Sequence, residues 1–144
     1  MDTNIILGIL LSWAAHLSGY PMPDALPEVR LVPHQYLVDN ACGGVECAVV
    51  GWYNDQRIIY IDDTLSDFED GFTSTLLVHE MTHYLQDISG EFDTLSCVDS
   101  VARERAAYYV QTVYAIATIA SPASIHLARG SLITCAYTGD HTND

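Results

Sequence analysis

The first hydrophobic stretch of the chain has the pattern of a helix. Apolar side chains dominate residues 4–17, and Pro21 and Pro23 follow, which a helix does not easily include. We therefore expect a helix within residues 1–20 that packs on the rest of the domain. The stretch is too short to span a membrane. It also lacks the positive start and the small-residue cleavage site of a convincing signal peptide.

Two later stretches also predict helices. The apolar run 73–85 indicates a buried helix over residues 70–88. Over residues 94–120, apolar side chains recur at helical spacing, which predicts another long helix. They are Val98, Val101, Ala102, Ala106, Tyr109, Val113 and Ile116.

Short runs rich in β-forming residues lie between the first two helices. Residues 48–53 and 57–61 flank Asn54-Asp55-Gln56, which has the composition of a turn, so we expect a hairpin. Residues 28–32 are a third predicted strand, giving a small, mainly antiparallel sheet within residues 28–62. Residues 121–144 form a C-terminal extension. The whole chain, 1–144, is thus predicted to be a single α+β domain.

The helix predicted over residues 70–88 contains His79-Glu80-Met81-Thr82-His83, an HExxH motif. Residues four apart share a helix face, so His79 and His83 can present their ring nitrogens to one metal ion, with Glu80 beside it. Burying three polar side chains is unfavourable unless they are coordinated or hydrogen-bonded. The alternative is a pair of core histidines that neighbouring groups satisfy without a metal.

Neutral imidazoles suit zinc, and a catalytic zinc usually has three protein ligands and one position open to water. The sequence therefore predicts Zn²⁺ as the cofactor, on the basis of ligand type, with Glu80 as general base. A metzincin would have glycine at position 86 and histidine at position 89. The chain has Gln86 and Ser89, so that class is excluded.

The third ligand has four candidates downstream of the motif, namely Glu91, Asp93, Asp99 and Glu104. Glu91 and Asp93 lie with a glycine in a short connector, where acidic residues are usually solvated. Glu104 borders the apolar face of the helix predicted over residues 94–120. The alternative for Glu104 is an ion pair with Arg103, Arg105 or Arg57.

An HExxH helix, followed 21 residues after the second histidine by a glutamate on an antiparallel helix, resembles the gluzincin-type zincin metallopeptidases. The resemblance covers residues 29–120. It implies zinc bound by His79, His83 and Glu104, with Glu80 as catalytic base. It also implies a small sheet packed on the two long helices, with an edge strand that pairs with an extended peptide substrate.

The chain departs from the family after the glutamate. Gluzincins commonly continue with a Ser-Asp or Ala-rich pattern, whereas Glu104 is followed by Arg-Ala-Ala-Tyr. The residue that orients His79 is therefore not identified, and Asp99 and Gln111 are candidates because ligating histidines donate their other N–H to an oxygen. A donor for the transition-state oxyanion is also needed. Candidates of the right type are Tyr108, Arg105, Tyr60 and Tyr109.

The net charge of the protein limits the classes of molecule that it is expected to bind. Nineteen acidic residues against five arginines and no lysine give a net charge of −14. Nucleic acids and anionic membrane surfaces are disfavoured because phosphate contacts require a basic face. The expected partner is a peptide or protein substrate.

The four cysteines bear on localisation. Cys42 and Cys47 flank a Gly-Gly loop, and Cys97 could meet Cys135 if the C-terminal extension folds back. Two disulfides would fit an extracellular or virion setting, while four reduced, packed cysteines remain an equal alternative. The localisation is not determined by sequence.

Two function hypotheses follow. The first is a zinc-dependent peptidase that attacks peptide bonds with metal-activated water. The second is a structural or assembly protein, such as a particle or fibre subunit or another homo-oligomer, whose metal site is idle or structural. A metal-independent binding domain is a third reading, which requires the histidine pair to be coincidental.

Overall fold

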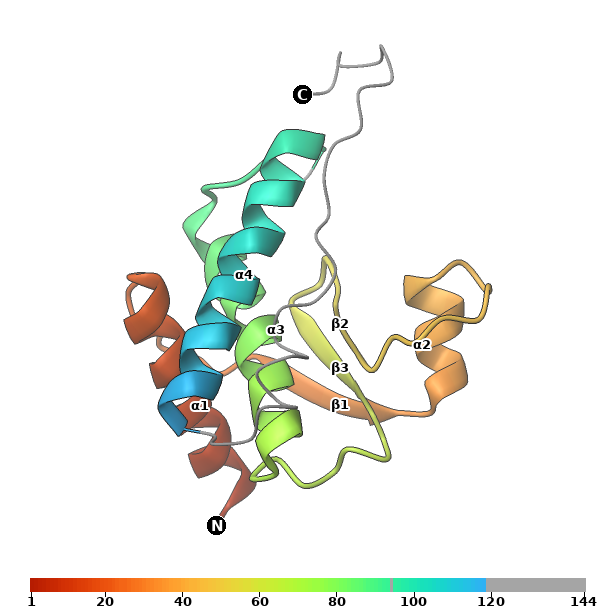
Figure 1. Cartoon of the computed structure of the whole chain (residues 1–144), viewed down its shortest axis with the longest axis horizontal. Helices are drawn as coiled ribbons and strands as arrows, with labels where there is room; N and C mark the ends of the chain where they lie inside the picture. Colours follow the sequence, from red (N-terminus) through yellow and green to blue (C-terminus); the bar gives the residue numbers. More distant parts are fainter. Residues whose placement is uncertain (94, 119–144) are drawn as a thin grey trace.

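Four helices and a three-stranded sheet make up an α+β fold in the computed structural model, which describes residues 1–93 and 95–118 (Figure 1). In chain order they are α1 (Thr3–Ser18), β1 (Glu28–Val32), α2 (His34–Ala41), β2 (Gly51–Tyr53), β3 (Ile58–Asp62), α3 (Gly71–Ser89) and α4 (Cys97–Thr118). Helices α1, α3 and α4 gather on one side of the sheet and α2 lies on the other (Figure 1). The predicted extension, residues 121–144, lies outside the described residues.

The three long helices agree with the hydrophobic pattern. α1 lies within the predicted residues 1–20, α3 is within one residue of the predicted bounds, and α4 lies inside 94–120. The ends of α3 follow from local chemistry. The Asp70 carboxylate accepts a hydrogen bond from the Thr73 N–H (3.2 Å), and Gly90 ends the helix in the left-handed conformation with φ 68°.

The prediction of a mainly antiparallel sheet is wrong. The strand order is β1-β3-β2, and β1 pairs in parallel with β3 over five residues, whereas β2 pairs antiparallel over three. The hairpin of β2 and β3 is as expected. The parallel pairing arises because α2, a helix that the sequence pattern did not predict, links β1 to the hairpin and turns the chain back. α2 is short and buries only Leu37 and Val38.

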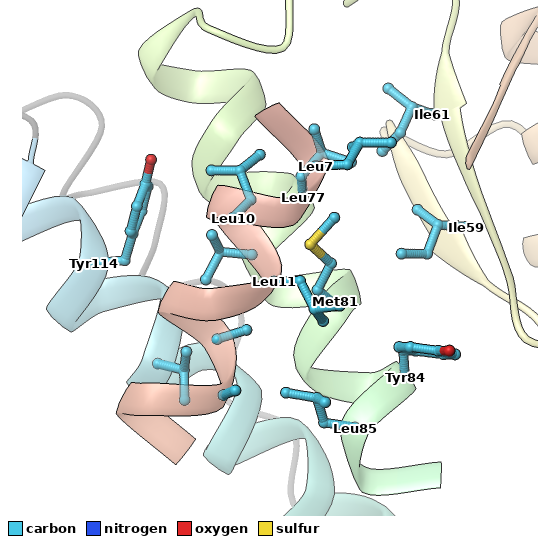
Figure 2. Close-up of a cluster of buried hydrophobic side chains, with 14 residues drawn as sticks. Leu7, Leu10, Leu11, Ile59, Ile61, Leu77, Met81, Tyr84, Leu85 and Tyr114 are labelled. Carbon is cyan, nitrogen blue, oxygen red and sulfur yellow. The ribbon is translucent and has the colours of Figure 1, made fainter. Parts of the chain in front are cut away.

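The main core lies between the sheet and the three long helices (Figure 2). Ile59 and Ile61 of β3 face this core, while Ile58 and Tyr60 point to the opposite side and pack with Leu37 of α2. β3 is therefore covered on both faces and buried along its whole length. The main core also holds Leu7, Leu10 and Leu11 of α1, Leu77, Met81 and Leu85 of α3, and Tyr114 of α4. This packing fixes α3, which carries the HExxH motif.

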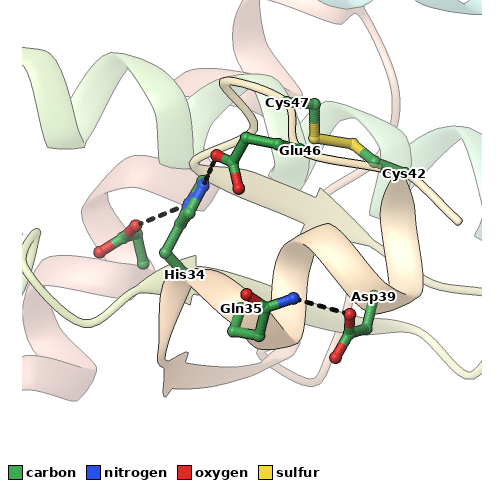
Figure 3. Close-up of a disulfide and its surroundings, with 7 residues drawn as sticks. His34, Gln35, Asp39, Cys42, Glu46 and Cys47 are labelled. Carbon is green, nitrogen blue, oxygen red and sulfur yellow. Dashed lines mark hydrogen bonds and ion pairs between the residues drawn. A yellow bond between two sulfur atoms is a disulfide. The ribbon is translucent and has the colours of Figure 1, made fainter. Parts of the chain in front are cut away.

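A disulfide closes the loop after α2, between Cys42 and Cys47 (Figure 3). Glu46 of this loop accepts a hydrogen bond from the His34 ring at 2.8 Å, so the loop is held against the start of α2. The predicted partner of Cys97, Cys135, lies outside the described residues. In the described part of the chain, no helix is both long and apolar enough to cross a membrane.

Candidate metal centre

His79 and His83 lie one turn apart on the buried face of α3. Both rings are almost completely enclosed, and their Nε2 atoms are 3.2 Å apart. α3 holds them in this position because the preceding and following turns are anchored in the core by Leu77, Met81 and Leu85. The helical spacing predicted from sequence therefore places two ring nitrogens at one point.

Glu104 of α4 faces the same point. Its Oε1 lies 2.7 Å from Nε2 of His79, and its Oε2 lies 3.1 Å from Nε2 of His83. Among the described residues, these three side chains form the one group of histidine, cysteine and acidic residues with ligand atoms gathered closely enough for a single ion, all within 4.8 Å of one another. Ligands about 2.0–2.2 Å from a tetrahedral zinc would be about 3.3–3.6 Å apart. The three side chains therefore fit a zinc ion with little rearrangement.

The electrostatics of the group also favour a cation. Burial raises the pKa of Glu104, but hydrogen bonds with His79 and His83 outweigh it and hold this pKa well below its ordinary range. Burial lowers the pKa of His79, yet the carboxylates of Glu104 and Glu80 raise it above its ordinary value. Without an ion, the two imidazole nitrogens can hydrogen-bond to the one carboxylate only if each nitrogen carries a proton directed at it. A central cation would satisfy all three.

Glu80 stands beside this group without belonging to it. Its side chain is buried, and its Oε2 has no hydrogen-bond partner among the described residues. It lines the same cavity as His79 and Glu104. A buried carboxylate oxygen without a protein partner is free to accept a proton from a molecule in that cavity.

The cavity has a volume of about 420 Å³ and lies between α3, α4 and the segment that leads into β2. Glu104, Tyr108 and Gln111 reach it because positions four and three apart share one face of α4. Phe72 and Leu76 line it from α3. Its remaining wall consists of Ala48, Val49, Val50 and Gly51. The cavity is thus lined both by two of the candidate ligands, His79 and Glu104, and by apolar side chains.

Gly51 explains how the wall comes so close to α3. A Cβ atom added at this position would lie 3.0–3.2 Å from three atoms of the Leu76 side chain. Only glycine allows this approach without displacing Leu76. Since β2 is an outer strand in the order β1-β3-β2, the edge of the sheet at the cavity is that of β2 and its lead-in segment.

Tyr108 is the one predicted oxyanion donor that lines the cavity. Its ring centroid is 4.5 Å from that of His79, and burial, followed by the charges of Glu104 and Glu80, raises its pKa. Tyr60 is buried toward α2, and Tyr109 and Arg105 are exposed on α4. These three do not line the cavity.

The two predicted orienting residues differ in position. Gln111 is buried, lines the cavity and contributes to the raised pKa of His79. Within the described part of the chain, however, Nδ1 of His79 has no hydrogen bond of ordinary geometry. Asp99, near the start of α4, instead accepts a hydrogen bond of 2.7 Å from the N–H of Asp93, which lies in the connection between α3 and α4. Glu91, another ligand candidate, accepts one from the Tyr20 hydroxyl.

Gln86 is a residue of the site that was not predicted from sequence. Its Oε1 lies 2.8 Å from Nδ1 of His83, and its Nε2 donates to the backbone carbonyl of Arg103 at 2.9 Å. The signal that could have revealed it is its position, three residues after His83, where helical geometry brings it beside the ring. In the prediction from sequence, the presence of glutamine at position 86 was used only to exclude the metzincin class.

Protein-family models, curated proteins and solved structures give no match to this chain. The assignment of function therefore depends on the chemistry and geometry of the residues themselves.

Proposed function

We propose that the protein is a zinc-dependent peptidase. The single observation that carries the proposal is the convergence of His79, His83 and Glu104 at one end of a cavity into which Glu80 also faces. Two neutral nitrogens and one carboxylate are a ligand set of catalytic zinc, which leaves a position open toward the cavity. Zinc held there would supply Lewis acidity, polarising a peptide carbonyl and acidifying a water molecule.

Glu80 is the general base of this proposal. Its partnerless Oε2 can accept the proton of the attacking water, and the protonated carboxyl can then deliver that proton to the leaving amine nitrogen. Its neighbour in sequence, His79, is a candidate ligand, so the base lies next to the reacting centre without occupying a ligand position. The carboxylate of Glu80 therefore begins and ends the cycle in the same protonation state.

Tyr108 is the proposed donor to the oxyanion that forms on the carbonyl oxygen. The raised pKa keeps its phenol protonated at neutral pH, so that it can donate a hydrogen bond. Its position four residues after Glu104 places both side chains at the same end of the cavity.

The substrate we propose is a peptide in extended conformation. The lead-in segment 48–50 and β2 form an edge beside the candidate centre, and an extended peptide can add to such an edge through backbone hydrogen bonds. The apolar wall next to it can accommodate side chains of the substrate.

Replacing Glu80 by glutamine tests the proposal. The wild type should cleave an unstructured protein such as casein, whereas Glu80→Gln should retain zinc and lose at least about 100-fold in kcat, as expected when a general base is removed. Glu91→Gln is the matched control, since Glu91 is exposed and lies in the α3–α4 connection. Unchanged cleavage by Glu80→Gln would contradict the proposed mechanism.

A second candidate is an assembly protein on the same scaffold. The observation that favours it is the presence of large apolar side chains on outer faces of two helices, Ile5 and Ile9 on α1 and Tyr109 and Ile116 on α4. Such side chains are common at interfaces between copies. Sedimentation analysis separates the two candidates, because an assembly protein should form a defined oligomer that Glu80→Gln leaves intact. An extracellular or virion setting remains a prediction.

A further inference from the structure

We infer that Gln86 is a positioning residue that sets the proton position on His83 and ties α3 to α4 at the ligand glutamate. The inference rests on the proposed zinc site. It assigns a role to a side chain that lies outside the HExxH motif.

The Gln86 side chain is 2% exposed, and both ends of its amide are hydrogen-bonded within the protein. A buried amide is costly unless its groups are paired. Here each partner belongs to a different helix, His83 to α3 and Arg103 to α4. Gln86 therefore joins the two helices that supply the three candidate ligands.

The Arg103 carbonyl decides which way the amide points. A carbonyl oxygen only accepts hydrogen bonds, so the group 2.9 Å away must be the NH₂ of Gln86. The opposite orientation would place two oxygens against each other. The amide oxygen of Gln86 must therefore face Nδ1 of His83 at 2.8 Å.

This orientation in turn fixes the His83 ring. Because the amide oxygen is an acceptor, Nδ1 of His83 must carry a hydrogen. In the neutral ring, the lone pair is then on Nε2, which is the atom that faces His79 and Glu104. A backbone carbonyl of α4 thus selects the form of His83 that can bind a metal through Nε2.

The same bond positions the third ligand. Arg103 directly precedes Glu104, so the bond from Gln86 holds α4 at the residue next to the candidate ligand. His79 has no matching hydrogen bond, since its Nδ1 lacks a partner of ordinary geometry among the residues described. Gln86 therefore acts on two of the three ligands through one side chain.

The test compares zinc affinity and the His83 ring proton in Gln86 variants, without using peptidase activity. Gln86→Met removes both hydrogen bonds at similar volume and should weaken zinc binding by about 10- to 100-fold, measured by competition with a chromophoric chelator. Gln86→Glu keeps the acceptor for Nδ1–H but faces Arg103 with an oxygen, so its zinc affinity should lie between those of Gln86→Met and the wild type. Thr82→Val is the control, because it removes a buried hydroxyl from α3 whose hydrogen bond, within the described residues, goes to the Val78 carbonyl.

NMR of the zinc-loaded protein supplies the readout that a purely structural role would not change. The Nδ1 proton of His83 should exchange slowly in wild type and Gln86→Glu, and rapidly in Gln86→Met.

Equal zinc affinity of wild type and Gln86→Met would overturn the inference, as would binding of zinc through Nδ1 of His83. If Gln86→Met does not fold, Gln86→Glu decides: wild-type zinc affinity in that variant overturns the tie to Arg103. Zinc binding without peptide cleavage would refute the peptidase proposal alone, whereas a wild type that binds no zinc would refute both.

Discussion

The carboxylate of Glu104 lies 2.7 Å from Nε2 of His79, although the two residues are 25 positions apart in the chain. The contact exists because α3 and α4 pack side by side and each turns one polar face toward the other. On α3 that face continues with His83, and on α4 it continues with Tyr108 and Gln111. The packing of two helices thereby brings the candidate ligands, the proposed base and the proposed donor together.

Tyr108→Phe should lower kcat without removing zinc. The phenol hydroxyl is proposed to stabilise the oxyanion of the transition state, and loss of one such donor typically costs about 100- to 1,000-fold in kcat. KM should change little, because the phenyl ring keeps its place against His79. Steady-state kinetics on a fluorogenic peptide checks this. Tyr109→Phe is the control, since Tyr109 is exposed on the same helix, and equal effects of the two variants would argue against the role of Tyr108.

The contribution of Glu104 and His79 to the stability of the metal-free protein should be largest between about pH 4.5 and 6.5. The pKa of Glu104 is lowered from its ordinary value of 4.5, so its contribution is present above pH 4.5 and is lost as the pH falls through the folded-state pKa. The pKa of His79 is raised from 6.5, so its contribution is present below pH 6.5 and is lost as the pH rises through the folded-state value. Urea unfolding midpoints from well below pH 4.5 to well above pH 6.5, in the presence of a chelator, measure the profile. Glu104→Gln should flatten it, and an unchanged profile would count against the ion pair.

Gly51→Ala should raise KM by moving the cavity wall. The added methyl would lie 3.0–3.2 Å from the Leu76 side chain, so either this side chain or the segment before β2 must move, and both line the cavity. Zinc content should remain that of the wild type, because no ligand contacts Gly51. The double variant Gly51→Ala, Leu76→Ala removes the clash and should recover part of the wild-type KM. Gly8→Ala, where the added carbon meets no atom within 4 Å, is the control. A KM that does not respond to Gly51→Ala would show that the wall does not contact substrate.

Leu77→Ala should destabilise the fold strongly. Leu77 is completely buried in the main core, next to the HExxH motif, and truncations of this kind cost about 2–5 kcal/mol. Leu95→Ala, at a side chain that is 81% exposed, should change the free energy of unfolding by less than about 0.5 kcal/mol. Urea denaturation of both variants measures the difference. Similar values for the two would mean that α3 is not packed as described.

The elements that the sequence predicted well are those with a strong local signal. Long apolar runs identified α1 and α3, and helical spacing identified α4, because burial of one helix face leaves a pattern within the segment itself. The pairing of His79 with His83 is local for the same reason. Glu104 was reached by position on a predicted helix face, and the structure places it against both histidines.

The features that were missed depend on distant partners. α2 has only eight residues and buries two of them, so its pattern is weak, and without it the parallel pairing of β1 with β3 could not be foreseen. The role proposed for Gln86 depends on a backbone carbonyl 17 residues away. Arg105 and Tyr108 are equivalent donor candidates in sequence, but the rotation of α4 brings only Tyr108 to the cavity.

Metal content tests the central claim most directly. Elemental analysis of protein purified without chelator should find one zinc per chain in wild type and in Glu91→Ala, and almost none in His83→Ala and Glu104→Ala. Loss in both ligand variants would show that α3 and α4 together hold the ion, as the 2.7 Å and 3.1 Å contacts of Glu104 predict. Absence of metal from the wild type, or full retention in Glu104→Ala, would contradict the assignment of this site.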